Sequence, residues 1–259
     1  MTADTPTTTL CHHNLEGVVY RDKDLVSELL GDNVDFTRVM SEHILGRDIS
    51  DIELKVINAA LVVLMEHGMT PSAISSRLVY MSAPESLQGA VAAGLLAVGS
   101  SFVGTMENCA ELLEEIVGCE SGAARIEKVQ KIVAAHREAG QPLPGFGHHL
   151  HKPDDPRAIE LLRLADQWGF NGGYVRALRM LGAVVDEQRG KHLTINATGA
   201  IAALFGEIGI PVRVMRGFAV ISRAAGLVAH VAEEQQAPSG RFIWDLVDRS
   251  IPYEGSAGR

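Results

Sequence analysis

Apolar residues recur every three or four positions along most of this 259-residue chain. In segment 123–139, for example, Ile126, Val129, Ile132 and Val133 follow this spacing. The spacing places apolar side chains on one face of an α-helix, whereas a half-buried strand needs strict alternation. The chain therefore predicts an all-α fold of roughly ten helices, with active-site loops at helix ends. Helical patterns cover residues 51–67, 109–117, 123–139, 157–168, 174–189, 199–208 and 217–234.

Two of these segments, 199–208 and 217–234, are rich in small residues. Small residues let helix backbones approach closely, so both helices are predicted to be buried. Strand signals are few. Residues 17–20 predict a short hairpin with the residues before them, and 192–196 are a short extended candidate.

The charge balance limits the partners of this chain. It carries 32 acidic and 23 basic residues, a formal net charge of −9. No long basic cluster stands out, so we expect no nucleic-acid partner. An anionic substrate would have to be held by a few local cations rather than by the overall field. Hydrophobic residues make up 46% of the chain, enough for a sizeable core.

Cysteine usage indicates the compartment. Cys11, Cys109 and Cys119 are widely spaced and form neither a zinc pattern nor a disulfide framework, which favours a reducing environment. The first residues lack the basic and apolar regions of a signal peptide. The most apolar segment, 57–65, is too short to span a bilayer. We therefore expect a cytoplasmic protein that does not associate with membranes.

The segment 144–148 reads Pro-Gly-Phe-Gly-His, and Arg157 follows nine residues after its histidine. The glycines would let a ligand approach the backbone closely. Arg157 follows Pro156, which opens a new helix, and an arginine there can grip a carboxylate. This pair predicts proton transfer on a carboxylate-bearing substrate. The alternative is an ordinary loop whose histidine forms a surface cluster with His149 and His151.

A second histidine, His67, is predicted to lie on the last turn of the 51–67 helix. The dipole at a helix C-terminus favours an imidazolium, so this position suits a charged, functional side chain. The alternative is a histidine that only caps the helix.

Arg223 lies within an otherwise apolar helix. A buried, unpaired charge is costly, so this arginine needs an anionic or carbonyl partner. The partner could be structural, at Glu233, Glu234 or Asp245, or it could be a ligand carboxylate. His230, seven residues after the arginine, is predicted on the same helix face.

Together these motifs resemble the citrate synthase superfamily, with a closer likeness to citryl-CoA lyases and the C-terminal lyase module of ATP-citrate lyase. The resemblance covers nearly the whole chain. It implies a large helical domain, residues 1–101 and 199–259, and a smaller domain, 102–198, that closes over the substrate. Its motifs lie at residues 66–72, 93–99, 145–148, 155–157, 196–205 and 217–230, with Arg241 near the C-terminus.

The resemblance implies roles for the residues that carry it. His67 would bind and polarise the oxaloacetate carbonyl. His148 would exchange a proton with the hydroxyl at that carbon. Arg157 and Arg223 would clamp carboxylates, and Arg241 would reach the site from a neighbouring subunit. Members of the family are dimers or dimers of dimers, so a homodimer or homotetramer is expected.

The resemblance also implies coenzyme A as part of the substrate, with no permanently bound cofactor. Gly145, Phe146 and Gly147 would lie against coenzyme A, and Lys152 would contact its phosphates. No metal is expected, because Cys11-His12-His13 and the histidines near residue 148 lack the second half of a standard site. The third glycine of a dinucleotide fingerprint is also missing.

Two departures from the family pattern bear on the reaction. Citrate synthases have a histidine where this chain has Phe102, which favours a lyase over a synthase. The catalytic aspartate of the family is replaced by Thr198, whose hydroxyl is not basic near neutral pH. In the cleaving direction His148 could still be the base, and Thr198 could at most position a water that returns the proton.

Three functions therefore stay open. The first is a citryl-CoA lyase type of enzyme, which cleaves a 3-hydroxy-3-carboxyacyl-CoA to acetyl-CoA and a 2-oxo acid such as oxaloacetate. The second is a lyase or aldolase for a different CoA thioester. The third is a CoA-binding subunit with weakened catalysis.

Overall fold

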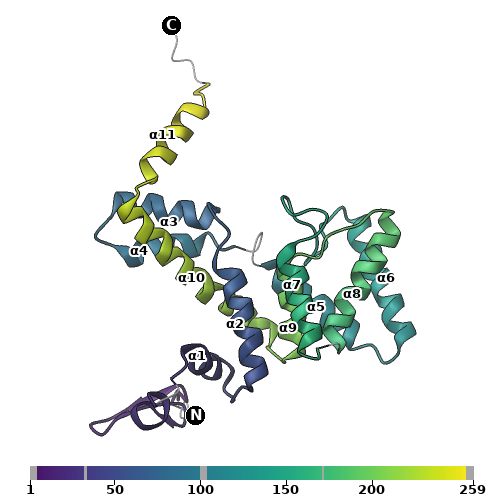
Figure 1. Cartoon of the computed structure of the whole chain (residues 1–259), viewed down its shortest axis with the longest axis horizontal. Helices are drawn as coiled ribbons and strands as arrows, with labels where there is room; N and C mark the ends of the chain where they lie inside the picture. Colours follow the sequence, from purple (N-terminus) through teal and green to yellow (C-terminus); the bar gives the residue numbers. More distant parts are fainter. Residues whose placement is uncertain (1–4, 32–33, 100–103, 171, 255–259) are drawn as a thin grey trace. The chain divides into compact units, whose positions relative to one another are not determined.

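The computed structural model describes residues 5–31, 34–99, 104–170 and 172–254. Contacts divide the chain into one unit from Met1 to Asn58 and a second from Ala59 to Arg259. Helices dominate the described residues, so the all-α prediction is confirmed (Figure 1). The predicted division into a large and a small domain stays a prediction. Its boundary at 101/102, like Phe102 itself, lies outside the described residues.

The first unit holds a small antiparallel sheet. Its strands are β1 (Cys11–His13), β2 (Val18–Tyr20) and β3 (Lys23–Asp24), in the order β1-β2-β3. β1 and β2 form the predicted hairpin, with Cys11 opposite Tyr20. A π-helical turn, η1 (Leu25–Leu29), follows β3, and α1 (Phe36–Leu45) follows the turn.

The remaining helices include all seven predicted segments, each with slightly different ends. Helices α1, α3, α4 and α11 lie outside the predicted segments. The helices after α1 are α2 (Asp51–Met65), α3 (Pro71–Ser82), α4 (Leu87–Leu96), α5 (Gly104–Val117), α6 (Gly122–Glu138), α7 (Pro156–Gln167), α8 (Gly173–Arg189), α9 (Ala197–Glu207), α10 (Val212–Gln236) and α11 (Gly240–Ser250).

Helix α9 lies at the centre of the second unit and packs against α5, α7 and α8. Residues Ala200 to Phe205 are all buried, as the small-residue pattern predicted. Gly206 has no room for a side chain, because a Cβ atom there would overlap the ring of Tyr174. The small residues of α9 thus bring α8 close to it, and its first turn lies in the site described below.

Helix α10 packs against α3, α4 and α5 (Figure 1). It begins five residues before the predicted start at Gly217, since Met215 and Phe218 are buried on either side of the glycine and packing outweighs its low helix propensity. By length and composition, α10 is the one helix of the described residues that could cross a membrane. A core helix passes the same test, and α10 buries residues along its length.

Candidate active site

A short ladder joins the His148 loop to the start of α9. The Gly147 N–H donates to the Thr194 carbonyl at 2.7 Å, and the Asn196 N–H donates to the Gly145 carbonyl at 3.0 Å. Between them, Phe146 and Ile195 form an isolated antiparallel bridge. The extended segment predicted at 192–196 is therefore realised as one bridge rather than a full strand. The ladder holds the residues before His148 beside the first turn of α9.

Both glycines of the loop have a backbone conformation that favours glycine, and Gly145 is also tightly packed. Both have positive φ angles, +82° at Gly145 and +80° at Gly147, which favour glycine. A Cβ atom on Gly145 would lie 2.5 Å from the Cys109 sulfur and 3.0 Å from the Gly199 Cα atom. The protein itself therefore fills the space on the Cβ side of Gly145, and the contact of this glycine with coenzyme A stays a prediction.

Asp155 orients Arg157 at the start of α7. This aspartate is fully buried, and its two carboxylate oxygens accept from the Arg157 Nε and Nη2 atoms at 2.9 and 2.8 Å. They also accept from the backbone N–H groups of Arg157 and Ala197, at 3.0 and 3.1 Å. Burial alone would raise the pKa of Asp155, but the hydrogen bonds from Arg157 lower it overall. The carboxylate is therefore ionised and fixes the guanidinium in one orientation.

His148 is surrounded by hydrogen-bond donors. Its Nδ1 accepts from the backbone N–H groups of Leu150 and His151, at 3.1 and 3.0 Å. An imidazole nitrogen that accepts carries no proton, so the proton of the neutral ring lies on Nε2. That Nε2 is 3.2 Å from Nη2 of Arg157. An arginine only donates, so the Nε2–H of His148 and the Arg157 N–H face each other as two donors, and a ligand oxygen that accepts from both would relieve this contact.

Both histidines near Arg157 are neutral at pH 7. Burial lowers the pKa of His148, and the charges of His151 and Arg157 lower it further. Burial, followed by the charge of Arg157, also lowers the pKa of His67. The predicted imidazolium at His67 is therefore wrong: α2 ends at Met65, two residues earlier, and the neighbouring cation outweighs any helix dipole. Nδ1 of His67 lies 3.4 Å from Nη1 of Arg157.

Arg223 presents an unpaired guanidinium nitrogen. Its Nη1 atom is buried and has no hydrogen-bond partner within the described part of the chain. The structural partners considered above are engaged elsewhere, because Glu233 and Glu234 bind Arg77 and Asp245 binds Arg241. Burial lowers the pKa of Arg223, and the charge of Glu66 partly offsets this. Of the two readings, the structure favours a guanidinium left open for a ligand carboxylate.

Thr198 belongs to a network of neutral side chains. Its hydroxyl donates to Oδ1 of Asn196 at 2.7 Å and lies 3.1 Å from the hydroxyl of Thr105. Oδ1 of Asn196 also accepts from the Gly199 N–H, and Nδ2 of Asn196 donates to the Gly147 carbonyl. The network thus connects Thr198 to the ladder before His148, and Thr198, Thr105, Asn196 and Gly199 carry no side chain that could act as a base near neutral pH.

The histidine rings gather around His148. The rings of His149 and His151 stack on it, with centroids 4.7 and 4.4 Å away, and the His67 ring meets it edge-on at 5.5 Å. The structure thus brings the surface cluster of the alternative reading into the same site as Arg157. Across the described residues, no three or more histidine, cysteine, aspartate or glutamate side chains are arranged to hold a metal ion.

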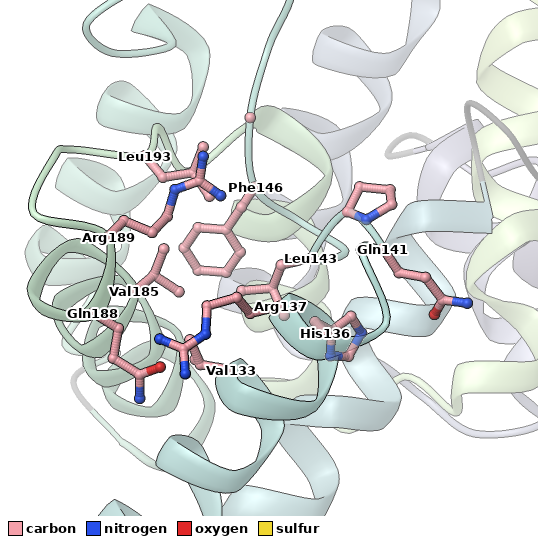
Figure 2. Close-up of a pocket in the computed structure, with 13 residues that line it drawn as sticks. Val133, His136, Arg137, Gln141, Leu143, Phe146, Val185, Gln188, Arg189 and Leu193 are labelled. Atoms are coloured by element: carbon pink, nitrogen blue, oxygen red, sulfur yellow. The ribbon is translucent and has the colours of Figure 1, made fainter.

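A cavity of about 490 Å³ lies beside Phe146 and Gly147. Figure 2 shows the side chains of Arg137 and Arg189 on two sides of the Phe146 ring. Both arginines are exposed and have no ion-pair partner among the described residues, and Oε1 of Gln188 is buried without a hydrogen bond. The cavity is lined by Val133, His136, Arg137, Gly140, Gln141, Pro142, Leu143, Phe146, Gly147, Val185, Gln188, Arg189 and Leu193.

Two predicted site residues are not brought to these groups. Arg241 pairs with Asp245 at 3.0 Å and lies 4.8 Å from the ring centroid of Trp244, all within α11. Lys152 is exposed and does not line the cavity.

Sequence reasoning also missed several residues of the site. Asp155 could have been found from the sequence, because an aspartate followed by proline is a common start of a helix. No sequence pattern marks Arg137, Gln188 and Arg189, since they come together only through the packing of α6 and α8.

Comparisons with known proteins show the family and the fold. The family described as "Citrate synthase, C-terminal domain" matches residues 3–244. A solved citryl-CoA lyase from Hydrogenobacter thermophilus is 33% identical, with a TM-score of 0.85 over 98% of this chain and 96% of that one. The fold is shared with an ATP citrate lyase from Methanothrix soehngenii, solved with citrate and coenzyme A, at 20% identity and a TM-score of 0.79, over 100% of this chain and 43% of that one.

Among curated proteins, Citrate synthase 2 of Bacillus subtilis is 26% identical over 211 residues, which are 80% of this chain and 54% of that protein. The chain thus spans about half the length of this relative. The matched family covers nearly all of the chain, including the histidines and arginines of the site, and the chain belongs to the citrate synthase family.

Proposed function

We propose that this protein is a carbon–carbon lyase of the citryl-CoA type, which cleaves a 3-hydroxy-3-carboxyacyl-CoA to acetyl-CoA and a 2-oxo acid such as oxaloacetate. The observation that carries the proposal is that His148 and His67 both contact Arg157, while the charge of Arg223, whose Nη1 has no partner among the described residues, acts on His67. Such a set suits a substrate with a carboxylate beside an oxygen that gains negative charge. The 33% identity to a citryl-CoA lyase supports the same chemistry.

His148 is the electrophile in this proposal, and His67 is the base. The two backbone N–H groups at Nδ1 of His148 disfavour a proton there, so its Nε2–H donates to the reacting oxygen. This differs from the role that the family resemblance implied, because an Nε2 that already carries a proton cannot accept another. His67 is the second neutral imidazole beside Arg157, and its lowered pKa keeps it able to accept a proton.

Cleavage moves the hydroxyl proton of the substrate and the electron pair of its C–C bond. The hydroxyl proton of the substrate moves to His67, and the oxygen becomes the carbonyl of the 2-oxo acid. The C–C bond breaks, and its electron pair forms the enolate of the acetyl thioester. That enolate takes a proton from water at the end of the site marked by Thr198, and the proton held by His67 neutralises the hydroxide that forms, so that the ring is neutral again. Arg157 and Arg223 hold the carboxylates throughout.

Coenzyme A would occupy the cavity beside Phe146. Arg137 and Arg189 are unpaired cations suited to its phosphates, and the buried Oε1 of Gln188 is an acceptor suited to an adenine amino group. The Methanothrix soehngenii ATP citrate lyase, which shares this fold, was solved with citrate and coenzyme A. Lys152 could reach the phosphates from outside the cavity. No permanently bound cofactor is part of the proposal.

Thr198 favours a second candidate, a lyase for a different CoA thioester. The side chains hydrogen-bonded to Thr198, those of Asn196 and Thr105, are neutral and cannot deprotonate an acetyl methyl group, so the acyl portion could differ from acetyl. Incubation with (3S)-citryl-CoA, followed by mass spectrometry, tests the main proposal. Release of acetyl-CoA and oxaloacetate is expected. Cleavage of other CoA thioesters but not citryl-CoA would favour the second candidate, and binding without turnover would favour a CoA-binding subunit.

The proposal includes a cytoplasmic homodimer or homotetramer. Three free cysteines support a reducing compartment. Helix α11 leaves Phe242, Trp244 and Leu246 exposed, which supports association with a second subunit. In such an assembly Arg241 could enter the site of the neighbour, as the family resemblance implied. Light scattering and Arg241→Gln, assayed for substrate affinity, would test both points.

The acid limb of the pH–activity profile is expected to have its inflection at a pH below that of an ordinary histidine. Because the pKa values of His67 and His148 lie below their ordinary value of about 6.5, both rings are neutral at pH 7 and protonate only at lower pH. We expect kcat/KM for citryl-CoA to hold near neutrality and to fall through an inflection below pH ~6.5. Arg157→Gln removes a charge that lowers both values, so its inflection should move to higher pH. An unshifted inflection in that variant would contradict the assignment.

Thr198→Asp is expected to create a base that the wild type lacks. In the wild type, condensation of acetyl-CoA with oxaloacetate should be barely detectable, because a threonine hydroxyl cannot take the methyl proton. The variant should raise exchange of the acetyl-CoA methyl protons with deuterated water when a dicarboxylate is present. Thr198→Asn has a similar size without the basic group and is the matched control. Fast exchange by the wild type would show that another base serves this carbon, with Asp154 the first to test.

A further inference from the structure

A chain of polar contacts leads from the buried interior of the second unit to the residue before His67. Arg77 is 3% exposed and donates to Nδ1 of His230 from its Nε and Nη2 atoms, at 3.0 and 2.8 Å. An arginine only donates, so Nδ1 of His230 accepts and the ring proton lies on Nε2. That Nε2 is 3.2 Å from Oε2 of Glu66, which also accepts from the His67 backbone N–H at 3.2 Å.

Glu66 lies over α10 between two possible partners. A Cβ atom on Gly226 would lie 2.6 Å from Oε1 of Glu66, so the carboxylate sits directly above that glycine. Arg223 is three residues before Gly226 and His230 is four residues after it, which places all three on one helix face. The carboxylate can therefore turn toward Arg223 on one side or toward His230 on the other.

In the structure Glu66 takes the His230 side. It accepts a hydrogen bond from Nε2 of His230, and no ion pair joins it to Arg223, whose buried Nη1 has no partner among the described residues. The charge of Glu66 nevertheless acts on Arg223. A carboxylate that moved to Arg223 would occupy the nitrogen that the proposed function gives to the substrate.

We infer that His230 is a positioning residue: it holds Glu66 away from Arg223 and so keeps that guanidinium free for a substrate carboxylate. Arg77 fixes the ring of His230 by holding Nδ1, and the Nε2–H of the ring holds Glu66. Gly226 gives the carboxylate its place on the helix. The inference rests on the proposed function only in giving Arg223 a substrate carboxylate.

The test removes the hydrogen bond and then the competing charge. In His230→Leu, oxaloacetate binding by calorimetry should weaken about tenfold, or ~1.4 kcal/mol, because Glu66 then pairs with Arg223. KM for citryl-CoA should rise by a similar factor, while kcat changes by no more than about twofold, as expected when only substrate binding is blocked. Adding Glu66→Gln to His230→Leu should restore the affinity. A merely structural defect would not respond to that second change.

Two variants separate this role from packing around Arg77. His230→Gln keeps an acceptor for Arg77 and a donor for Glu66, so it should bind oxaloacetate like the wild type. Glu233→Gln removes another partner of Arg77 without touching Glu66, so it should leave the affinity for oxaloacetate unchanged even if it lowers stability. Unaltered affinity in His230→Leu, or a loss that Glu66→Gln does not restore, would overturn the inference.

A ligand-free crystal structure of His230→Leu gives a readout independent of the reaction. We expect the Glu66 carboxylate within ion-pair distance of Arg223. If it stays on the His67 backbone N–H, the inference is wrong whatever the substrate is. If the wild type does not cleave citryl-CoA, the proposed function fails, and the position of Glu66 in this variant still decides the inference.

Discussion

His148→Ala is expected to lower kcat for citryl-CoA cleavage by roughly 100- to 1,000-fold, the usual cost of removing one donor to a developing oxyanion. The ring is half-buried, and its Nε2 lies 3.2 Å from Nη2 of Arg157. Without the ring, the reacting oxygen loses one of the two donors directed at it. The fold should survive, because the ladder at residues 145–147 and the Asp155 contacts to Arg157 do not involve His148. Steady-state kinetics and circular dichroism measure both effects.

His149→Ala is the matched comparison, since this exposed neighbour stacks on His148, whereas the described hydrogen bonds of Arg157 go to Asp155, His67 and His148. It should keep most of the activity. If His148→Ala instead retained more than about a tenth of the wild-type rate, a loss of less than ~1.4 kcal/mol of transition-state stabilisation, the donor role would belong to another residue. His149 would then be the first suspect.

Arg223→Gln is expected to weaken binding of the carboxylate-bearing substrate by roughly 10- to 150-fold, the equivalent of ~1.5–3 kcal/mol for a charge-assisted hydrogen bond. Affinity for coenzyme A alone should change little, because the cavity beside Phe146 is lined by other residues. Arg223 is a cleaner test than Arg157, whose removal would leave the buried carboxylate of Asp155 unpaired. Calorimetry with oxaloacetate and with coenzyme A provides the comparison.

Arg213→Gln is the control on the same helix, because Arg213 is exposed on α10 and outside the site. It should leave both affinities near the wild-type values. Equal losses of affinity for oxaloacetate and for coenzyme A in Arg223→Gln would show that this arginine supports the fold rather than the substrate.

The all-α fold and the approximate positions of seven helices were predictable because they depend on local signals. Asp155 and Pro156 begin α7, Asn196 begins α9, and Gly190 ends α8 with a φ of +64°. Helix propensity, caps and apolar spacing act within a few residues, so a single chain displays them. The hairpin at 17–20 was predictable for the same reason. The start of α10 was not, because burial of Met215 and Phe218 overrides the glycine between them.

The amino-acid sequence by itself determined which residues could do chemistry: two histidines, two arginines and a threonine in place of the family aspartate. Only the tertiary structure decided which of these side chains are protonated and which are paired. Neutral His67 follows from burial and the charge of Arg157, which lies ninety residues away in the chain. Nη1 of Arg223 has no partner among the described residues, because Arg77 binds the candidates Glu233 and Glu234. Protonation and pairing depend on distances between side chains far apart in sequence, and only packing sets those distances.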